Sequence, residues 1–150
     1  MLPKVCLVRK AVITEVAQTS ELVKVFVYGT LKPGGASYQR YCSDYVVEAY
    51  PMLAKGQLFA LPVGYPAMSM GEGWVHGFLL WFQDAKILNQ LDEYEGYELG
   101  RSPQQNLYQR ELIEVFNPMK KPRGFAWAYL MTSRQICHRG GVLLPEGRWK

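Results

Sequence analysis

One helix-like segment lies in a chain whose other patterned segments all look like β-strands, and this combination limits the fold more than any other feature. The helix-like segment, DAKILNQLDEYEG at residues 84–96, has apolar residues at helical spacing, with Asp84 as a potential N-cap and Gly96 as a C-terminal cap. Strand-like stretches lie at residues 23–28, within 46–61, and at 74–82, 107–116 and 125–131. Many strands and one main helix predict an α+β domain with a mostly antiparallel, barrel-like sheet and few flanking helices.

The length of 150 residues is sufficient for one domain with a single hydrophobic core. We expect this domain at residues 23–150, after an N-terminal extension at residues 1–22 whose strand-like piece, 11–16, either pairs with the sheet or stays loose. No apolar run approaches the ~20 residues of a membrane span, and the first residues do not resemble a signal peptide. The sequence therefore predicts a cytoplasmic protein with no membrane partner.

The cysteines indicate neither a disulfide framework nor a zinc site. They are Cys6, Cys42 and Cys137, an odd number without close spacing. We expect all of them to be buried free thiols.

The net charge of +4 is unevenly distributed along the chain. Residues 119–150 contain seven lysines and arginines against one acidic residue, Glu146. Because no nucleic-acid-binding motif accompanies them, we expect a solvated basic face that attracts small anionic substrates, and no nucleic-acid partner. The alternative, nucleic-acid binding, predicts an affinity that falls steeply with salt.

The segment VFVYGTLKPGG at residues 25–35 places a strand directly before a loop rich in glycine and proline. It imitates a P-loop, but Gly34 is followed by Gly35 and Ala36 instead of the lysine and hydroxyl residue that such loops require. Two interpretations remain. Either the amides of residues 29–31 form a concave site for a smaller anion such as a carboxylate, or the segment is a tight turn at the end of a strand.

Helical geometry separates the acidic residues of LDEYEGYE, residues 91–98. At about 100° per residue, Glu93 falls opposite the apolar face and Asp92 on its outer flank, whereas Glu95 lies on the apolar side. A carboxyl group there is costly unless it has a partner or a task. Glu95 is therefore either a salt-bridged or frayed end of the helix, or a general acid/base whose pKa is raised by partial burial.

Six stretches in a fixed order carry a resemblance to a known family. They are VFVYGTLKPG, GQLFALPVGYPAM, VHGFLLWF, LDEYEGY, LYQRELIEVF and AWAYLM, and they cover roughly residues 23–131. Together they resemble the γ-glutamylcyclotransferase-like superfamily, which includes plant avirulence-induced proteins and γ-glutamylamine cyclotransferases. Tyr-Gly-Thr-Leu followed about sixty residues later by Leu-Asp-x-x-Glu-Gly is specific as a pair, although each half alone is weak.

This resemblance implies a compact barrel with a cavity where the strand-exit loop meets the acidic end of the helix. It also implies roles for five residues. Tyr28, Gly29, Thr30 and Leu31 would bind the γ-glutamyl part of the substrate, and Glu95 would be the catalytic acid/base.

The implied reaction needs no cofactor or metal, because a γ-glutamyl amide carries its own nucleophile. Its α-amino group attacks the side-chain carbonyl and releases 5-oxoproline and an amine. Tyr108 and Tyr129 either offer hydroxyl groups to the pocket or are ordinary strand tyrosines with exposed tips. We assign no role to His76 or His138.

Two further expectations concern what the resemblance leaves open. Residues 98–106 look like an inserted loop close to the site, and such a loop could change which leaving amine fits. The alternative function is a non-catalytic module of the same fold that binds a ligand or a protein partner.

Overall fold

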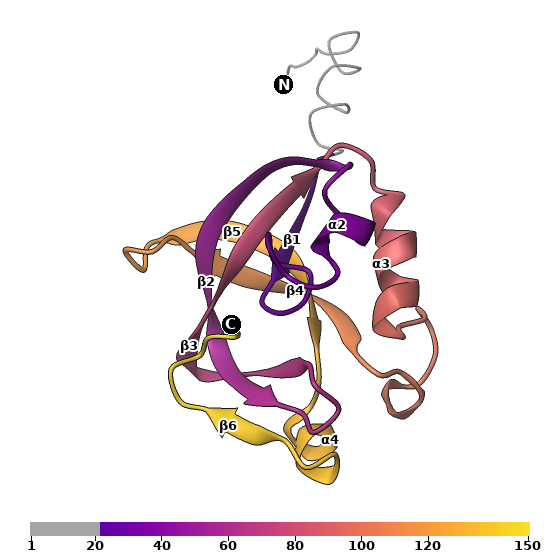
Figure 1. The fold of residues 1–150 in the computed structure, drawn as a ribbon, viewed down its shortest axis with the longest axis vertical. Helices are drawn as coiled ribbons and strands as arrows, with labels where there is room; N and C mark the ends of the chain where they lie inside the picture. Colours follow the sequence, from indigo (N-terminus) through magenta and orange to yellow (C-terminus); the bar gives the residue numbers. More distant parts are fainter. Residues whose placement is uncertain (1–21) are drawn as a thin grey trace, which may run out of the picture.

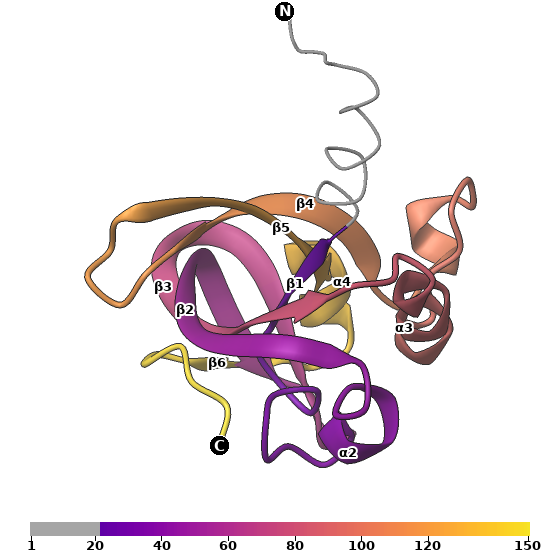
Figure 2. The same cartoon turned by 90° about the horizontal axis from the view of Figure 1, so that it is seen from above.

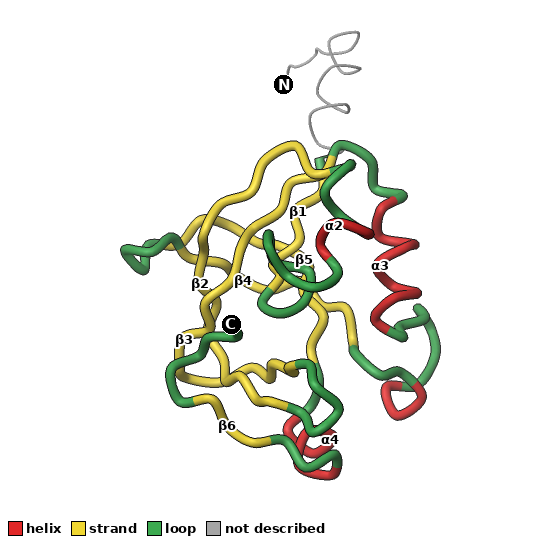
Figure 3. Tube along the Cα trace, in the orientation of Figure 1, coloured by secondary structure: helices red, strands yellow, loops and turns green. Residues whose placement is uncertain are grey.

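The computed structural model describes residues 22–150, so the expected strand at 11–16 lies outside the described residues. The strands are β1 (Val23–Val27), β2 (Val46–Ala60), β3 (Pro66–Phe82), β4 (Gln109–Phe116), β5 (Pro122–Leu130) and β6 (Val142–Leu144). The helices are α2 (Tyr38–Tyr41), α3 (Ile87–Glu95) and α4 (Ser133–His138), with a single 3-10 turn, η1, at Pro103–Gln105. Figures 1 and 3 show a strand-rich molecule with α3 along one side.

The sheet closes on itself. Its order is β3-β1-β5-β4-β2, and an additional β2–β3 pairing completes a ring of five strands to which β6 adds at β2. Seen from above, the strands surround a common centre (Figure 2). All pairings are antiparallel except β1 with β5, which is parallel. The α+β class with a mostly antiparallel, barrel-like sheet is confirmed.

Strand β1 contributes to two parts of the core because its side chains alternate between two faces. Val25 and Val27 belong to one buried cluster, which also contains Ile87 and Leu91 of α3. Phe26 belongs to the other cluster, formed by side chains of β2, β3, β4 and β5. The end of β1 is therefore fixed between the ring and α3.

Strand β3 begins at Pro66, eight residues before the predicted start at Trp74. The missed part contains Ser69, Gly71 and Gly73, residues with weak strand propensity. It is nevertheless extended because it pairs with β2, from Gln57 opposite Ser69 to Ala60 opposite Pro66.

Helix α3 begins later than predicted and ends where predicted. Asp84 does not cap the helix itself, because its Oδ1 accepts a 2.9 Å hydrogen bond from the amide of Lys86 in the turn before Ile87. Gly96 adopts a left-handed conformation with φ 70°, and its amide bonds back to the last turn, as a C-terminal glycine cap does.

The C-terminal region contains two elements that the sequence did not predict, α4 and β6. Thr132 and Gln135 form a capping box that starts α4. This helix exposes Cys137 while its neighbour Ile136 points into the core, so the prediction of a buried thiol is wrong for Cys137 and holds for Cys42. Cys6 lies outside the described residues. Among residues 22–150, no helix is long and apolar enough to cross a membrane.

Candidate active site

A cavity of about 160 Å³ lies where the end of β1, the loop after it and the end of α3 meet. Its wall includes every residue that the sequence singled out for substrate binding or catalysis, although they come from four separate parts of the chain. These residues are Tyr28, Gly29, Thr30, Leu31, Glu95, Tyr108 and Tyr129.

The loop after β1 presents backbone amides at this cavity. The amide of Lys32 donates to the carbonyl of Gly29 over 3.0 Å, and the amide of Ser37 donates to the carbonyl of Thr30 over 2.9 Å. Within residues 22–150, the amides of Thr30 and Leu31 donate no hydrogen bond. Two free amides on successive residues are a feature of small anion-binding loops.

Position 29 requires glycine because the loop approaches another part of the cavity wall. A Cβ atom on Gly29 would lie 2.7 Å from Cγ and 3.1 Å from Cδ of Pro66. Pro66 itself lines the cavity. Any larger residue at position 29 would therefore displace the wall or the loop.

The loop is attached to α3 through Tyr94. The Tyr94 hydroxyl lies 2.9 Å from Oγ1 of Thr30 and 2.7 Å from Oγ of Ser37, so it forms hydrogen bonds with both. The ring of Tyr94 also packs against that of Tyr41 of α2, with 4.5 Å between ring centroids and 43° between the ring planes. These contacts fix the loop relative to Glu95, the next residue along α3.

Glu95 has an unpaired carboxyl group. It forms no ion pair with any residue of the described part of the chain, and burial raises its pKa from 4.5 to about 8. Glu93, two residues earlier, is exposed. The helical phase therefore separated these two acids correctly, and within residues 22–150 no basic side chain pairs with Glu95.

Three tyrosines around Glu95 use their hydroxyl protons within the protein. Tyr28 donates to the carbonyl of Tyr129 over 2.6 Å, Tyr108 to the carbonyl of Pro66 over 2.6 Å, and Tyr129 to Oδ1 of Asp92 over 2.7 Å. Burial raises the pKa of all three phenols, and the nearby charge of Glu95 raises it further. Their oxygen atoms keep acceptor capacity only, because the single proton of each is already donated.

Asp92 points toward the sheet, whereas the helical phase placed it on an outer flank. Its Oδ2 receives a 3.1 Å bond from Nη1 of Arg110, and the two side chains are only 18% and 14% exposed. The guanidinium of Arg110 also lies over the rings of Trp127 and Tyr97, at 4.8 and 5.4 Å from their centroids. The hydrogen bond from Tyr129 and the ion pair with Arg110 together outweigh the preference of the Asp92 carboxylate for water.

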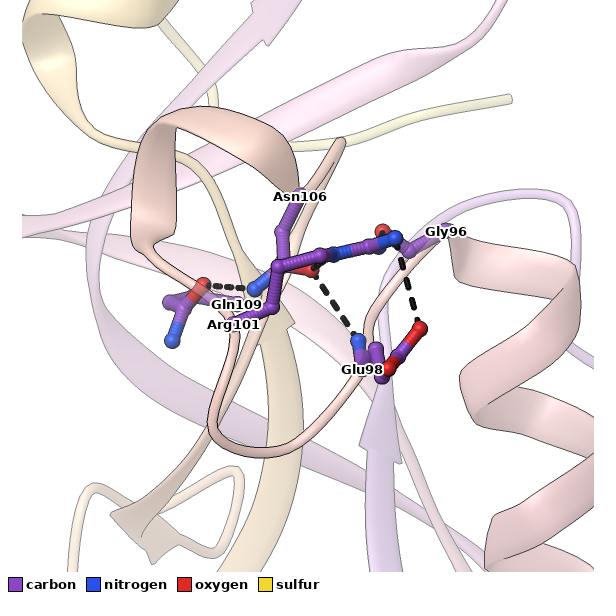
Figure 4. A network of polar contacts seen from close by, with 5 residues as sticks. All are labelled: Gly96, Glu98, Arg101, Asn106 and Gln109. Atoms are coloured by element: carbon purple, nitrogen blue, oxygen red, sulfur yellow. Dashed lines mark hydrogen bonds and ion pairs between the residues drawn. The ribbon is translucent and has the colours of Figure 1, made fainter.

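The segment that looked like an insertion, residues 98–106, is tied to the end of α3 (Figure 4). Asn106 is 2% exposed, and its Oδ1 accepts bonds from the amide of Glu98 and from Nε of Arg101. Arg101 also donates to the carbonyl of Gly96 over 3.1 Å. The segment thereby holds the residues that follow it, Leu107 and Tyr108, at the cavity.

Sequence reasoning missed Tyr94, Ser37 and Asp92. Tyr94 falls on the apolar side of the helix by its helical phase, which gives no sign of a polar role, and Ser37 carries no signal that distinguishes it from other loop serines. Nothing in the described part of the chain brings three or more histidine, cysteine or acidic side chains together as a metal site would.

Comparison with known proteins agrees with the resemblance. The family described as "Gamma-glutamyl cyclotransferase, AIG2-like" matches residues 25–150. A search of curated proteins found no match.

Solved structures share the fold at low sequence identity. A protein of Arabidopsis thaliana, solved in solution, is 24% identical with a TM-score of 0.58, over 76% of this chain and 71% of that one. An AIG2-like protein of Mus musculus is 17% identical with a TM-score of 0.56, over 87% and 89% of the two chains. A structure titled gamma-glutamyl cyclotransferase is 18% identical with a TM-score of 0.55, over 80% and 81%. This chain belongs to the AIG2-like γ-glutamyl cyclotransferase family.

Proposed function

We propose that the protein is a cofactor-independent γ-glutamyl cyclotransferase that releases 5-oxoproline and an amine from a γ-glutamyl amide. The observation that carries this proposal is the half-buried carboxyl group of Glu95, without an ion-pair partner in the described chain, in the same cavity as the free amides of Thr30 and Leu31. In its ionised form a second carboxyl group beside the amides opposes the binding of a carboxylate ligand, so simple anion capture gives this position no reason to titrate near neutral pH.

Substrate binding divides between the loop and the tyrosines. The amides of Thr30 and Leu31 donate to the α-carboxylate or to the reacting carbonyl oxygen. The hydroxyl oxygens of Tyr28 and Tyr108, whose protons are donated to backbone carbonyls, accept from the α-ammonium group. These contacts hold the substrate in a folded conformation.

Glu95 moves the proton. In the empty cavity, with a pKa of about 8, it holds a proton near neutral pH, and the positive charge of a bound ammonium group favours its ionised form. The carboxylate takes a proton from the ammonium group. The freed nitrogen attacks the γ-carbonyl carbon and closes the five-membered ring. Glu95 returns its proton to the leaving nitrogen as the bond to that nitrogen breaks, and the ring nitrogen loses its second proton to the departing amine.

General principles indicate that this arrangement is sufficient for catalysis. Well-oriented intramolecular reactions gain about 7–11 kcal/mol from positioning. Positioned general acid/base transfer adds roughly 10²–10⁴-fold. Neither contribution needs a nucleophilic side chain or an organic cofactor.

The test is incubation of the protein with a panel of γ-glutamyl amides, including peptides, a lysine isopeptide and small amines, followed by assay of 5-oxoproline. Release of 5-oxoproline supports the proposal and identifies the leaving amine. Binding of γ-glutamyl compounds without any release would favour the non-catalytic module instead.

The proposal includes a cytoplasmic location. Its support is that the thiols of Cys42 and Cys137 are not joined in disulfides.

A further inference from the structure

A second cavity, of about 710 Å³, lies between the hairpin of β2 and β3 and the segment after β6. This segment passes β3 at Gly147 and then runs to the loop after β1 (Figures 1 and 2). Two contacts hold it there. The amide of His76 donates to the carbonyl of Gly147 over 2.8 Å, and Nζ of Lys32 donates to the carbonyl of Trp149.

The polar part of this cavity is strongly cationic. Lys32, His76, Arg148 and Lys150 line it, with Glu146 as the one acidic residue of the lining. None of the four basic residues forms an ion pair with a carboxylate of the described chain. The cavity therefore gathers basic side chains that form no ion pair within residues 22–150.

The basic groups are close enough to repel one another. Burial and then the charge of Arg148 lower the pKa of Lys32. Burial lowers the pKa of His76, and the charges of Arg148, Lys120 and Lys32 lower it further. A bound anion would relieve this repulsion and favour the protonated imidazole.

The remaining wall is apolar and includes Met52, Phe78 and Trp149. We propose that this cavity binds a small organic anion, whose carboxylate or phosphate group contacts Lys32, His76 and Arg148 while its apolar part packs against Phe78 and Trp149. Its size fits a single small molecule, since ligand pockets commonly measure about 300–1,000 Å³.

This site is separate from the candidate active site, and it does not depend on the proposed reaction. Leu31 lines the first cavity and the adjacent Lys32 lines the second, but the two cavities share no residue. Spectral changes at the two sites can therefore be distinguished residue by residue.

The experiment is a titration of the isotopically labelled full chain, monitored by backbone amide and histidine resonances. The probes are inorganic phosphate, succinate and, as a third arm, a single-stranded oligonucleotide. We expect phosphate or succinate to give saturable shifts at Lys32, His76 and Gly147 and to raise the pKa of His76. Stronger binding of phosphate would indicate a phosphorylated ligand, and stronger binding of succinate a carboxylate.

Two variants and a matched control test the assignment. Arg148→Gln and Lys32→Gln should each weaken binding about tenfold or more, because each removes a charge-assisted contact. Arg134→Gln removes the same charge from an exposed position on α4, outside the cavity, and should change the affinity little. Arg148→Gln is the cleaner variant, since Lys32 also holds the C-terminal segment.

Three results would overturn the proposal. They are the lack of saturable shifts at millimolar phosphate and succinate, an equal loss of affinity in Arg134→Gln, and tight binding of the oligonucleotide without binding of either small anion. The last result would identify the basic residues as part of a nucleic-acid surface.

Discussion

The hydroxyl of Tyr129 donates a 2.7 Å hydrogen bond to Oδ1 of Asp92, and this bond joins β5 to the last turns of α3. Arg110 of β4 holds the other carboxylate oxygen of Asp92. Asp92 precedes Glu95 by three residues, so the two strands fix the helix close to the residue proposed to move the proton. This relationship gives Asp92 a positioning role, because its bonds go to the protein.

Asp92→Asn tests that relationship. The amide keeps an acceptor for Tyr129 but removes the negative charge opposite Arg110, whose Nε already has no hydrogen-bond partner in the described chain. We expect the free energy of unfolding to fall by roughly 1–3 kcal/mol, the range for a buried donor left unsatisfied. Urea denaturation measures this change.

The control is Glu93→Gln, at the exposed neighbouring position. Its free energy of unfolding should stay within about 0.5 kcal/mol of that of the wild type. Equal effects of the two substitutions would contradict the role of Asp92.

Tyr94→Phe tests the attachment of the loop to α3. It removes the hydroxyl that bonds to both Thr30 and Ser37 while keeping the ring against Tyr41. We expect a loss of about 1–2 kcal/mol in stability, together with weaker binding of 5-oxoproline, because the loop loses its fixed position. Calorimetry can measure both quantities. Tyr45→Phe, at a side chain that is 52% exposed, is the control and should change neither. Unchanged affinity in Tyr94→Phe would show that the loop keeps its geometry without this bond.

The loop itself should bind product. We expect 5-oxoproline to shift the amide resonances of Gly29, Thr30 and Leu31, and to raise the melting temperature by mass action. Gly29→Ala should weaken this binding, since the added Cβ would lie 2.7 Å from Cγ of Pro66. Gly71→Ala adds a Cβ at an ordinary 3.5 Å contact in β3 and is the matched control. If 5-oxoproline shifts only amide resonances far from the loop, the loop is not the product-binding site.

Burial of Glu95 makes a prediction about stability and pH. Because its pKa rises from 4.5 to about 8 on folding, the folded chain holds a proton between these values and the unfolded chain does not. This bound proton contributes to the free energy of unfolding. The contribution is fully present below pH 4.5 and is lost as the pH rises toward 8, and the free energy of unfolding falls by at most about 1.4 kcal/mol per pH unit.

The comparison that isolates this effect is Glu95→Gln against the wild type. Glutamine does not titrate, so only the wild type loses this contribution as the pH rises. The melting temperature of the variant minus that of the wild type should therefore increase from pH 5 to pH 8 and become constant above pH 8. Parallel pH profiles of the two proteins would mean that Glu95 is solvated in the folded chain.

The sequence was most informative where a pattern is local. The position of Glu95 followed from helical phase, and the loop followed from its glycine and its place after a buried strand. Asp92 could not be found this way, since its partners Arg110 and Tyr129 lie 18 and 37 residues further along the chain and come close only when the ring closes. The start of β3 at Pro66 was missed for a related reason, because pairing with β2 overrides the weak strand propensity of its glycines.

The last prediction concerns catalysis by Glu95. Glu95→Gln keeps the size of the side chain and removes the proton acceptor, so we expect an intact fold, retained binding of 5-oxoproline and a rate lower by about two or more decades, as for removal of a general acid/base. With the wild type, kcat/KM should rise as pH approaches 8, because the carboxylate is the form that accepts a proton; the variant should lack this rise. Glu93→Gln, on the exposed side of the same helix, should match the wild type in rate and pH dependence. The comparison requires a substrate that the wild type turns over, with folding checked by melting temperature. If Glu95→Gln cyclises that substrate at a near wild-type rate, another group moves the proton and the catalytic assignment of Glu95 is wrong.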